Sequence, residues 1–202
     1  MDKKELIKNL KHHKFSVKIL NAFSKIKRKN FIPKNLRIHA YEDNPLPIDE
    51  GATISQPYTI AFMLSLLELK DNLKILEIGS GSGYVLALIN EISKNSRIYG
   101  IERIKTLAEK SRKTIKNKNI KIIHRDGSNG LKESAPFDRI LISASCPKIP
   151  NHLYSQLSPK GVIVASVKNS IFQIKKDRIK KIRINEFSGF VFVPLIKGKA
   201  KK

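Results

Sequence analysis

The stretch Glu77-Ile78-Gly79-Ser80-Gly81-Ser82-Gly83 decides the fold class of this 202-residue chain. It follows residues 74–78, an apolar run typical of a buried strand, and precedes residues 84–92, whose apolar positions have helical spacing. Glycines at a strand-to-helix junction allow a tight turn and let a ligand lie close to the backbone. The loop therefore favours a nucleotide-like ligand, although it leaves a purely structural turn open as the alternative.

Short apolar runs alternate with segments of helical spacing after this loop. This alternation predicts right-handed crossovers and a mostly parallel sheet that is covered on both faces. The tail is expected to add strands antiparallel at one edge of that sheet. We expect parallel strands at 97–101, 120–123, 138–143 and 162–167, helices near 104–116 and 151–157, and tail strands at 171–175, 179–184 and 190–195.

The region before the loop has a different pattern. Residues 3–28 place apolar side chains at near-helical spacing among lysines, which predicts one or two amphipathic helices. Residues 29–56 contain several prolines and are expected to be largely irregular. A helix is expected to begin near Pro57, because proline is well accepted in a first helical turn.

Three acidic residues, Glu77, Glu102 and Asp126, stand at the ends of successive predicted strands, where ligands of open α/β sheets collect. Glu77 suits the aminoacyl ammonium of S-adenosylmethionine, Glu102 suits the ribose hydroxyls, and Asp126 suits the adenine amino group. A dinucleotide fits less well, because the loop lacks the last glycine of that motif and a pyrophosphate gains nothing from an acidic strand end. The residues thus predict a Rossmann-like S-adenosylmethionine-dependent methyltransferase fold, an α/β fold with antiparallel C-terminal strands and an N-terminal helical extension.

The net charge of +23 is concentrated at the two ends of the chain, with +8 in residues 1–48 and +10 in residues 160–202. A basic surface attracts nucleic acid through phosphate contacts, so such a partner is possible. A chain rich in Lys, Ile and Asn without Trp is also typical of a compositional bias, which we favour as the explanation of the charge. The basic runs are not interleaved with the aromatic residues that a base-stacking platform needs, so we do not favour nucleic acid as the partner.

The rest of the composition predicts a cytoplasmic protein without a membrane anchor. No apolar run approaches the roughly 20 residues that cross a bilayer. The N-terminus, residues 1–5, has mixed charge and lacks the apolar segment of a secretory signal. The single cysteine, Cys146, excludes an internal disulfide framework and a multi-cysteine zinc site. We therefore expect no metal site, and we also expect a monomer.

Segments on both sides of the loop resemble the protein-L-isoaspartate O-methyltransferase family over about residues 29–195. The most specific is Ala52-Thr53-Ile54-Ser55-Gln56-Pro57-Tyr58, which is similar to the active-site segment of that family. The other similar pieces, in chain order, are Phe31-Ile32-Pro33, Ala40-Tyr41-Glu42-Asp43, Pro45-Leu46-Pro47-Ile48, the glycine loop, Gly100-Ile101-Glu102-Arg103, Ala135-Pro136-Phe137-Asp138, Pro147-Lys148-Ile149-Pro150 and Phe192-Val193-Pro194-Leu195.

The resemblance implies an enzyme that transfers a methyl group from S-adenosyl-L-methionine to the α-carboxyl of L-isoaspartyl residues in damaged proteins. It implies that Ser55 is the active-site serine, and that Thr53, Ile54 and Gln56 bind the substrate. It also implies an extension at 1–56 that carries the active-site segment and a methyltransferase domain at 57–202, in one structural unit. The implied cofactor-binding residues are Glu77, Gly79, Ser80, Gly81, Gly83, Glu102, Arg103, Asp126 and Gly127.

A carboxylate acceptor is already ionised at neutral pH, so this chemistry needs no general base and no Ser-His-Asp set. Ser55 would then orient the acceptor by a hydrogen bond. The alternative is that Ser55 is simply the N-cap of the helix that begins near Pro57.

Two other functions stay open. One is a methyltransferase of the same fold that acts on RNA or another nucleic acid, although residues 143–146 read Ser-Ala-Ser-Cys in place of an Asn/Asp-Pro-Pro-aromatic motif. The other is a binding protein that kept the fold without activity. The chain also departs from the family pattern at Arg125, where a glycine is common, and at 166–168, where Ser-Val-Lys replaces Pro-Val-Gly.

Overall fold

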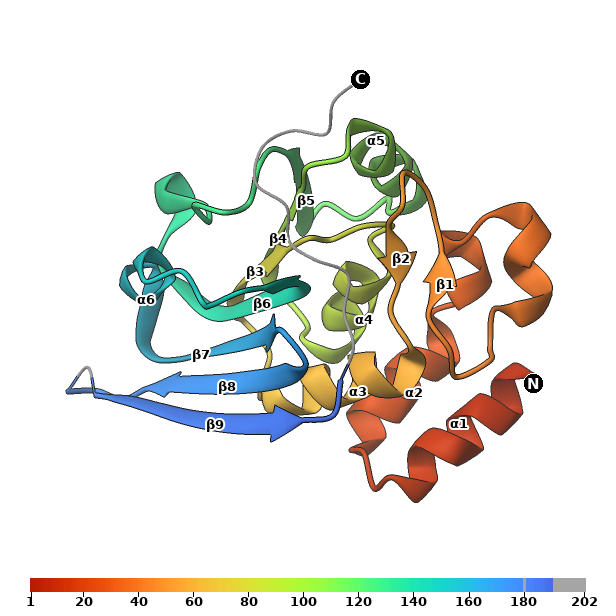
Figure 1. The fold of residues 1–202 in the computed structure, drawn as a ribbon, viewed down its shortest axis with the longest axis horizontal. Coiled ribbons are helices and arrows are strands. Elements are labelled where there is room, and N and C mark those ends of the chain that lie inside the picture. Colours follow the sequence, from red (N-terminus) through yellow and green to blue (C-terminus); the bar gives the residue numbers. More distant parts are fainter. Residues whose placement is uncertain (180, 191–202) are drawn as a thin grey trace.

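Seven strands form one sheet in the order β5-β4-β3-β6-β7-β8-β9 in the computed structural model, which describes residues 1–179 and 181–190 (Figure 1). The strands from β5 to β7 are parallel, whereas β8 and β9 each run antiparallel to the strand before them. This arrangement confirms the expected sheet. The strands are β3 (Lys74–Ile78), β4 (Arg97–Glu102), β5 (Ile120–His124), β6 (Phe137–Cys146), β7 (Leu157–Val167), β8 (Ser170–Lys176) and β9 (Ile182–Ser188).

The helices follow the predicted periodicity closely. The segment expected to be irregular contains two 3-10 helices and a short hairpin, β1 (Leu46–Pro47) with β2 (Thr53–Ile54). The α-helices are α1 (Lys3–His12), α2 (Val17–Lys25), α3 (Pro57–Leu66), α4 (Tyr84–Ile92), α5 (Lys105–Thr114) and α6 (His152–Ser155), and the 3-10 helices are η1 (Arg28–Phe31), η2 (Lys34–His39) and η3 (Lys132–Ser134).

Two apolar clusters cover the two faces of the sheet, because successive strand residues point to opposite faces. In β3, Ile75 belongs to the cluster that contains the buried residues of α1 to α5, whereas Leu76 belongs to the cluster formed with Leu131 and Leu153 of the η3 and α6 region. The first cluster joins residues of the N-terminal extension to the sheet, so that extension and the sheet share one core.

The C-terminal strands differ from the expectation in one place. The strand expected at 179–184 is wrong at both ends, since β9 begins at Ile182 and ends at Ser188. Asp177 closes a turn before it: its Oδ1 accepts the N–H of Lys181 at 2.8 Å, and its own N–H donates to the Lys181 carbonyl at 3.0 Å. Ile179 lies in this turn and is 83% exposed. The strand expected at 190–195 lies outside the described residues beyond Phe190.

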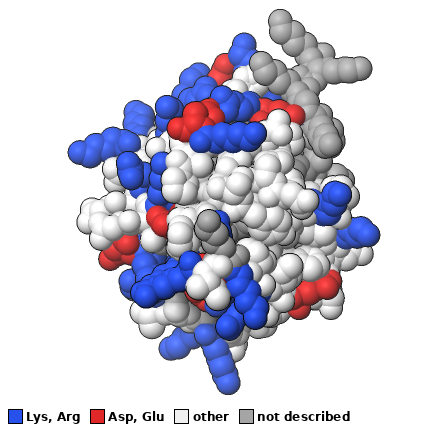
Figure 2. Space-filling view, turned by 90° about the vertical axis from the view of Figure 1, so that its left-hand side faces the viewer, with Lys and Arg blue, Asp and Glu red and all other residues white. Residues whose placement is uncertain are grey.

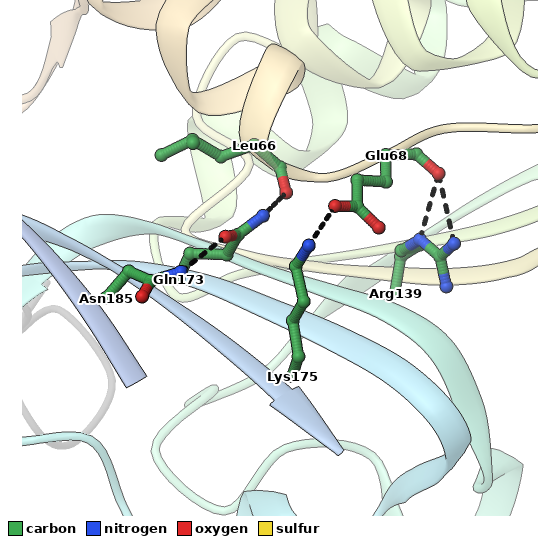
Figure 3. Close-up of polar contacts among 6 residues, drawn as sticks. All are labelled: Leu66, Glu68, Arg139, Gln173, Lys175 and Asn185. Carbon is green, nitrogen blue, oxygen red and sulfur yellow. Dashed lines mark hydrogen bonds and ion pairs between the residues drawn. The ribbon is translucent and has the colours of Figure 1, made fainter. Parts of the chain in front are cut away.

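Polar contacts fasten the end of α3 to the sheet (Figure 3). The buried Gln173 of β8 donates to the Leu66 carbonyl at 2.6 Å and accepts from Asn185 of β9 at 3.2 Å. Arg139 of β6 donates twice to the Glu68 carbonyl, at 3.2 and 3.0 Å, and Lys175 pairs with the Glu68 carboxylate. This anchor fixes the position of α3, which begins at Pro57, two residues after Ser55.

Replacing Gln173 with methionine is expected to lower the free energy of unfolding by about 1–3 kcal/mol, because the Leu66 carbonyl loses its donor in a buried place. The matched control is Lys175→Met on the same strand, which removes a half-exposed ion pair and should cost less than about 1 kcal/mol. Urea denaturation of both variants measures the difference. Equal losses would mean that the Gln173 contact has no special part in holding α3.

Candidate cofactor and acceptor site

A cavity of about 290 Å³ lies at the carboxyl ends of β3, β4 and β6. The strand order reverses here, since β4 lies on one side of β3 and β6 on the other, and such a reversal is where ligands bind in open α/β sheets. The hairpin β1–β2 forms the opposite wall. The cavity is lined by Glu50, Gly51, Ala52, Thr53 and Ser55 from that hairpin and by Ile78, Gly79, Gly81, Ile101, Glu102, Arg103, Ile104, Gly127, Ser143 and Ala144 from the sheet side.

Glu77 is a buried carboxylate directly behind this lining. Its Oε1 accepts the hydroxyl of Ser143 at 2.7 Å, while no described residue donates to its Oε2. Burial, with a smaller contribution from the nearby Glu102 carboxylate, raises the pKa of Glu77 to about 8 against the opposing hydrogen bond from Ser143. A cationic group would stabilise a buried carboxylate oxygen that accepts no hydrogen bond, so Glu77 is suited to bind the ammonium of an amino-acid-like ligand.

Glu102 holds the glycine loop and faces the same cavity. Its Oε2 accepts the N–H of Gly81 at 2.7 Å, and its Oε1 accepts the N–H of Ile104 at 2.8 Å. These two bonds fix the carboxylate at the end of β4. Each carboxylate oxygen retains a further lone pair, so Glu102 can still accept a pair of hydroxyl groups.

The glycines of the loop have separate roles. Gly79 and Gly81 line the cavity with φ of +80° and +52°, and a Cβ on Gly79 would lie 3.1 Å from the Cβ of Ala144. Gly83 instead begins α4 and packs on α5, where a Cβ would lie 2.6 Å from Cδ1 of Ile115. Ser80 is buried without being part of the lining. The structure therefore brings two of the predicted loop residues to the cavity and places Ser80 and Gly83 in its support.

Gly83→Ala is expected to lower the free energy of unfolding by about 2–3 kcal/mol, because a left-handed backbone is combined with a close contact to Cβ of Ser111 at 3.1 Å and a forced shift of the Ile115 side chain. Gly51→Ala is the matched control, because Gly51 has φ of +71° but a Cβ added there would meet no atom within 4 Å; it should show the backbone cost alone, about 1 kcal/mol. Thermal and urea denaturation measure both. A Gly83 variant no worse than the Gly51 variant would rule out close packing as the reason for glycine there.

The residues predicted for the adenine end lie only partly in the cavity lining. Gly127 and Arg103 line the cavity, whereas Asp126 accepts the N–H of Ser128 at 2.8 Å and is not part of the lining. Arg125, the departure from the family pattern, reaches away to Glu133 at 2.7 Å in an exposed ion pair. Arg125 therefore does not intrude on the cavity.

Ser55 lines both this cavity and a second hollow of about 430 Å³. Its hydroxyl has no hydrogen bond to a described residue. The N-cap of α3 is Gln56, and the first turn is closed by Asp43, whose Oδ1 accepts the N–H of Tyr58 at 2.8 Å. The structure therefore argues against Ser55 as a helix cap. The second hollow is lined by Pro45, Thr53, Ser55, Gln56, Tyr58, Thr59, Gly189 and Phe190.

The other predicted substrate residues differ in whether a substrate can reach their side chains. Thr53 lines both hollows, whereas Ile54 is part of the buried core. The side chain of Gln56 donates to Asp43 at 3.2 Å and accepts from Thr59 at 3.1 Å. Of the three, Thr53 is thus open to a substrate through its side chain, and Gln56 is occupied within the protein.

Two residues that organise the site, Arg28 and Asp43, are not among the predicted site residues. Arg28 is fully buried and donates to carbonyls of the 40–44 loop and of Ser55, and burial lowers its pKa to about 10. Asp43 closes the first turn of α3. Arg28 lies within a lysine-rich stretch that reads as a solvated surface, and only the tertiary structure distinguishes it.

Within the described part of the chain, no helix is long and apolar enough to cross a bilayer. No group of three or more His, Cys, Asp or Glu side chains in the same residues could hold a metal ion.

Comparisons with known proteins agree with this geometry. The sequence model of the protein-L-isoaspartate(D-aspartate) O-methyltransferase family matches residues 1–200. A protein-L-isoaspartate O-methyltransferase of Petrotoga mobilis is 46% identical over 187 residues, covering 89% of this chain and 87% of its own. One of Methanothrix thermoacetophila is 39% identical over 203 residues, covering 97% and 95%. The crystal structure of such a protein from Plasmodium falciparum with S-adenosyl-L-homocysteine superposes with a TM-score of 0.85 at 27% identity, covering 98% of this chain and all of that one.

Proposed function

The chain belongs to the protein-L-isoaspartate(D-aspartate) O-methyltransferase family, and on this premise we propose how its residues carry out the reaction. The enzyme transfers a methyl group from S-adenosyl-L-methionine to the α-carboxyl of L-isoaspartyl residues in damaged proteins. One observation carries the assignment of roles: the cavity has the Glu77 Oε2, which accepts no hydrogen bond from a described residue, behind one wall and the Ser55 hydroxyl on the opposite one.

Different residues of the cavity bind different parts of the cofactor. Glu77 binds the ammonium group through its Oε2, Glu102 accepts the ribose hydroxyls, and Gly79 and Gly81 let the ligand lie against the loop. Gly127, Arg103 and Asp126 form the adenine end. The buried orphan oxygen of Glu77 and the positive φ of the two glycines support this fit.

The acceptor peptide lies in the hollow beside Ser55 and Thr53, so that its carboxylate reaches the cofactor cavity at the two residues that the hollows share. Ser55 donates its hydroxyl to that carboxylate and orients it. The acceptor is ionised at neutral pH, so the protein need not remove a proton.

When bound, S-adenosylmethionine supplies a methyl group on a positively charged sulfur. The part of the protein is to hold the carboxylate in line with that methyl group and to keep water out of the cavity, because both reacting charges disappear in the transfer. The hairpin β1–β2, which carries Glu50, Gly51 and Ala52 over the cavity, provides the cover.

The test is transfer of labelled methyl from S-adenosylmethionine to matched peptides that contain isoaspartate or aspartate. We expect a base-labile methyl ester on the isoaspartyl peptide alone. Label in bulk RNA with none in either peptide would overturn the assignment in favour of a nucleic-acid methyltransferase. Absence of transfer to any of these, with cofactor binding intact, would indicate a silent binding protein.

We further propose that the protein works as a cytoplasmic monomer on protein substrates, with residues 1–56 as the extension that brings Ser55 to the methyltransferase domain at 57–202. Its single cysteine, which is buried, is consistent with a reducing compartment. On the face drawn in Figure 2, Lys and Arg side chains stand in separate groups, several of them beside Asp and Glu, so this face does not favour nucleic acid as a partner. Sedimentation equilibrium tests the monomer.

A further inference from the structure

Arg28 places a buried guanidinium against four main-chain carbonyls. Nη1 donates to Ala40 at 2.9 Å and to Glu42 at 3.4 Å, and Nη2 donates to Asn44 at 3.0 Å and to Ser55 at 3.1 Å. No described carboxylate forms an ion pair with it, and its Nε has no partner among the described residues. Peptide dipoles solvate the buried cation, and the Asp43 carboxylate stabilises it electrostatically without forming an ion pair. Its contacts all lie on two segments: the 40–44 loop and the acceptor segment.

The contact with Ser55 fixes the direction of one peptide unit. The Ser55–Gln56 bond is trans, because the only cis bond among the described residues precedes Pro136. In a planar trans unit the C=O and the N–H point in opposite directions. With the Ser55 carbonyl turned to Arg28, the N–H of Gln56 points away from Arg28, and no described residue accepts it. Gln56 itself lines the acceptor hollow.

The side chain of Gln56 is held elsewhere, by Asp43 and Thr59. Asp43 belongs to the loop whose carbonyls Arg28 also binds, so the same cation supports the second anchor of this residue. The main-chain N–H is thus the group of Gln56 that is available to a ligand. A carbonyl that accepts from a guanidinium also polarises its own peptide unit and strengthens its N–H as a donor.

We infer that Arg28 is a positioning residue of the acceptor site, which turns the main-chain N–H of Gln56 toward the substrate carboxylate as a second donor beside the Ser55 hydroxyl. This inference rests on the proposed function. Two donors define the plane of a carboxylate and leave a lone pair for the methyl group, whereas one hydroxyl leaves the carboxylate free to rotate. Arg28 acts only through the peptide unit that it holds.

The test removes the N–H of residue 56 against a control that removes only the side chain. Gln56 has φ of −53°, close to the value of about −65° that proline imposes, so Gln56→Pro deletes the N–H with little change of backbone, and Gln56→Ala keeps it. We expect kcat/KM for an isoaspartyl peptide to be about 10- to 100-fold lower in Gln56→Pro than in Gln56→Ala, the range of a hydrogen bond to a charged group. The dissociation constant for S-adenosylmethionine should be the same in both variants.

A backbone ester at position 56, made by incorporating lactic acid, repeats the comparison with the side chain of the alanine variant and without the proline ring. Equal kcat/KM for the alanine variant and the folded ester or proline variant would overturn the inference. The wild type is assayed first: if it fails to methylate the isoaspartyl peptide, the proposed function fails, whereas an active wild type with equal variants rejects the inference alone.

The role of Arg28 is tested by Arg28→Lys alone and together with Gln56→Pro. A lysine cannot hold four carbonyls in one plane, so we expect kcat/KM to fall in Arg28→Lys with cofactor affinity unchanged. If Arg28 acts through the Gln56 N–H, the double variant loses no more than Gln56→Pro alone. Losses that multiply in the double variant would show a structural role separate from that N–H and would contradict the inference.

Discussion

Replacing Glu77 with glutamine is expected to weaken the binding of S-adenosylmethionine by about 100-fold at pH 8, because a buried ammonium would lose its charge partner. The substitution keeps the size of the side chain and an acceptor oxygen for Ser143, which donates to Oε1 in the wild type. What changes is the charge behind the cavity wall. Isothermal titration calorimetry measures the effect directly, and no peptide substrate is needed.

The affinity for S-adenosylmethionine should also depend on pH through the ionisation of Glu77. Burial and Glu102 raise the pKa of Glu77 to about 8, so the carboxyl group is protonated in the ligand-free protein at neutral pH. A bound ammonium favours the ionised form, so binding releases a proton. The affinity of the wild type should therefore rise by close to tenfold per pH unit as the pH increases toward about 8. In Glu77→Gln this rise should be absent.

The same group makes the opposite contribution to the stability of the ligand-free protein. A carboxyl whose folded pKa is raised binds its proton more tightly when folded, so its contribution to the unfolding free energy falls as the pH rises from the unfolded value of 4.5 to about 8. Glu77→Gln removes that fall, and the ligand-free variant should be more stable than the wild type at pH 8. Poorer binding with higher stability is the combined signature.

A control carboxylate separates this signature from a general effect of charge. Glu91→Gln removes a carboxylate of α4 that pairs with Lys25 and Lys94 at the surface, where the two lysines lower its pKa. It should leave cofactor affinity and its pH dependence unchanged. If Glu77→Gln bound S-adenosylmethionine as the wild type does, the ammonium would have to be bound by another group.

Much of the fold could be predicted because local sequence patterns indicate most of its helices and strands. The bounds of β3 and α4 agree with the expected residues 74–78 and 84–92, since a buried apolar strand and a helix meet at a glycine loop. The start of β9 could not be predicted, because it depends on the turn that Asp177 closes with Lys181. An apolar residue such as Ile179 looks like part of a strand until that turn places it in solvent.

The same distinction applies to the site: some of its residues follow from local patterns, and others depend on tertiary contacts. Glu77, Gly79 and Glu102 follow from the rule that ligands gather at the carboxyl ends of parallel strands, and the structure brings them to one cavity. Gly83 shares their motif and supports α5 instead, because a glycine pattern does not tell close packing from close approach of a ligand. Arg28 and Asp43 act over sequence separations of 27 and 15 residues, so their roles emerge only when the chain is folded, although Asp43 lies in a segment that resembles the family.

Replacing Ser55 with alanine is expected to lower kcat/KM for an isoaspartyl peptide by about 100- to 1000-fold, the cost of losing one donor to a reacting oxygen. The cofactor affinity should be unchanged, because the ammonium, ribose and adenine ends of the cavity are built from other residues. Methyl transfer to the peptide and calorimetric titration of S-adenosylmethionine measure the two quantities on one preparation. Ser65→Ala, on the exposed side of α3, is the control and should leave both quantities as they are.

Stability decides between this role and the helix cap that the sequence alone allows. Loss of an N-cap serine costs about 0.5–2 kcal/mol of unfolding free energy. In the structure the N-cap of α3 is Gln56, and Asp43 supplies the side-chain acceptor to Tyr58. Ser55→Ala should therefore unfold at the wild-type urea concentration while losing activity. A Ser55→Ala variant that loses this unfolding free energy and retains its activity would reject the catalytic role of Ser55. The hydroxyl would then stabilise α3, and the main chain alone would orient the acceptor carboxylate.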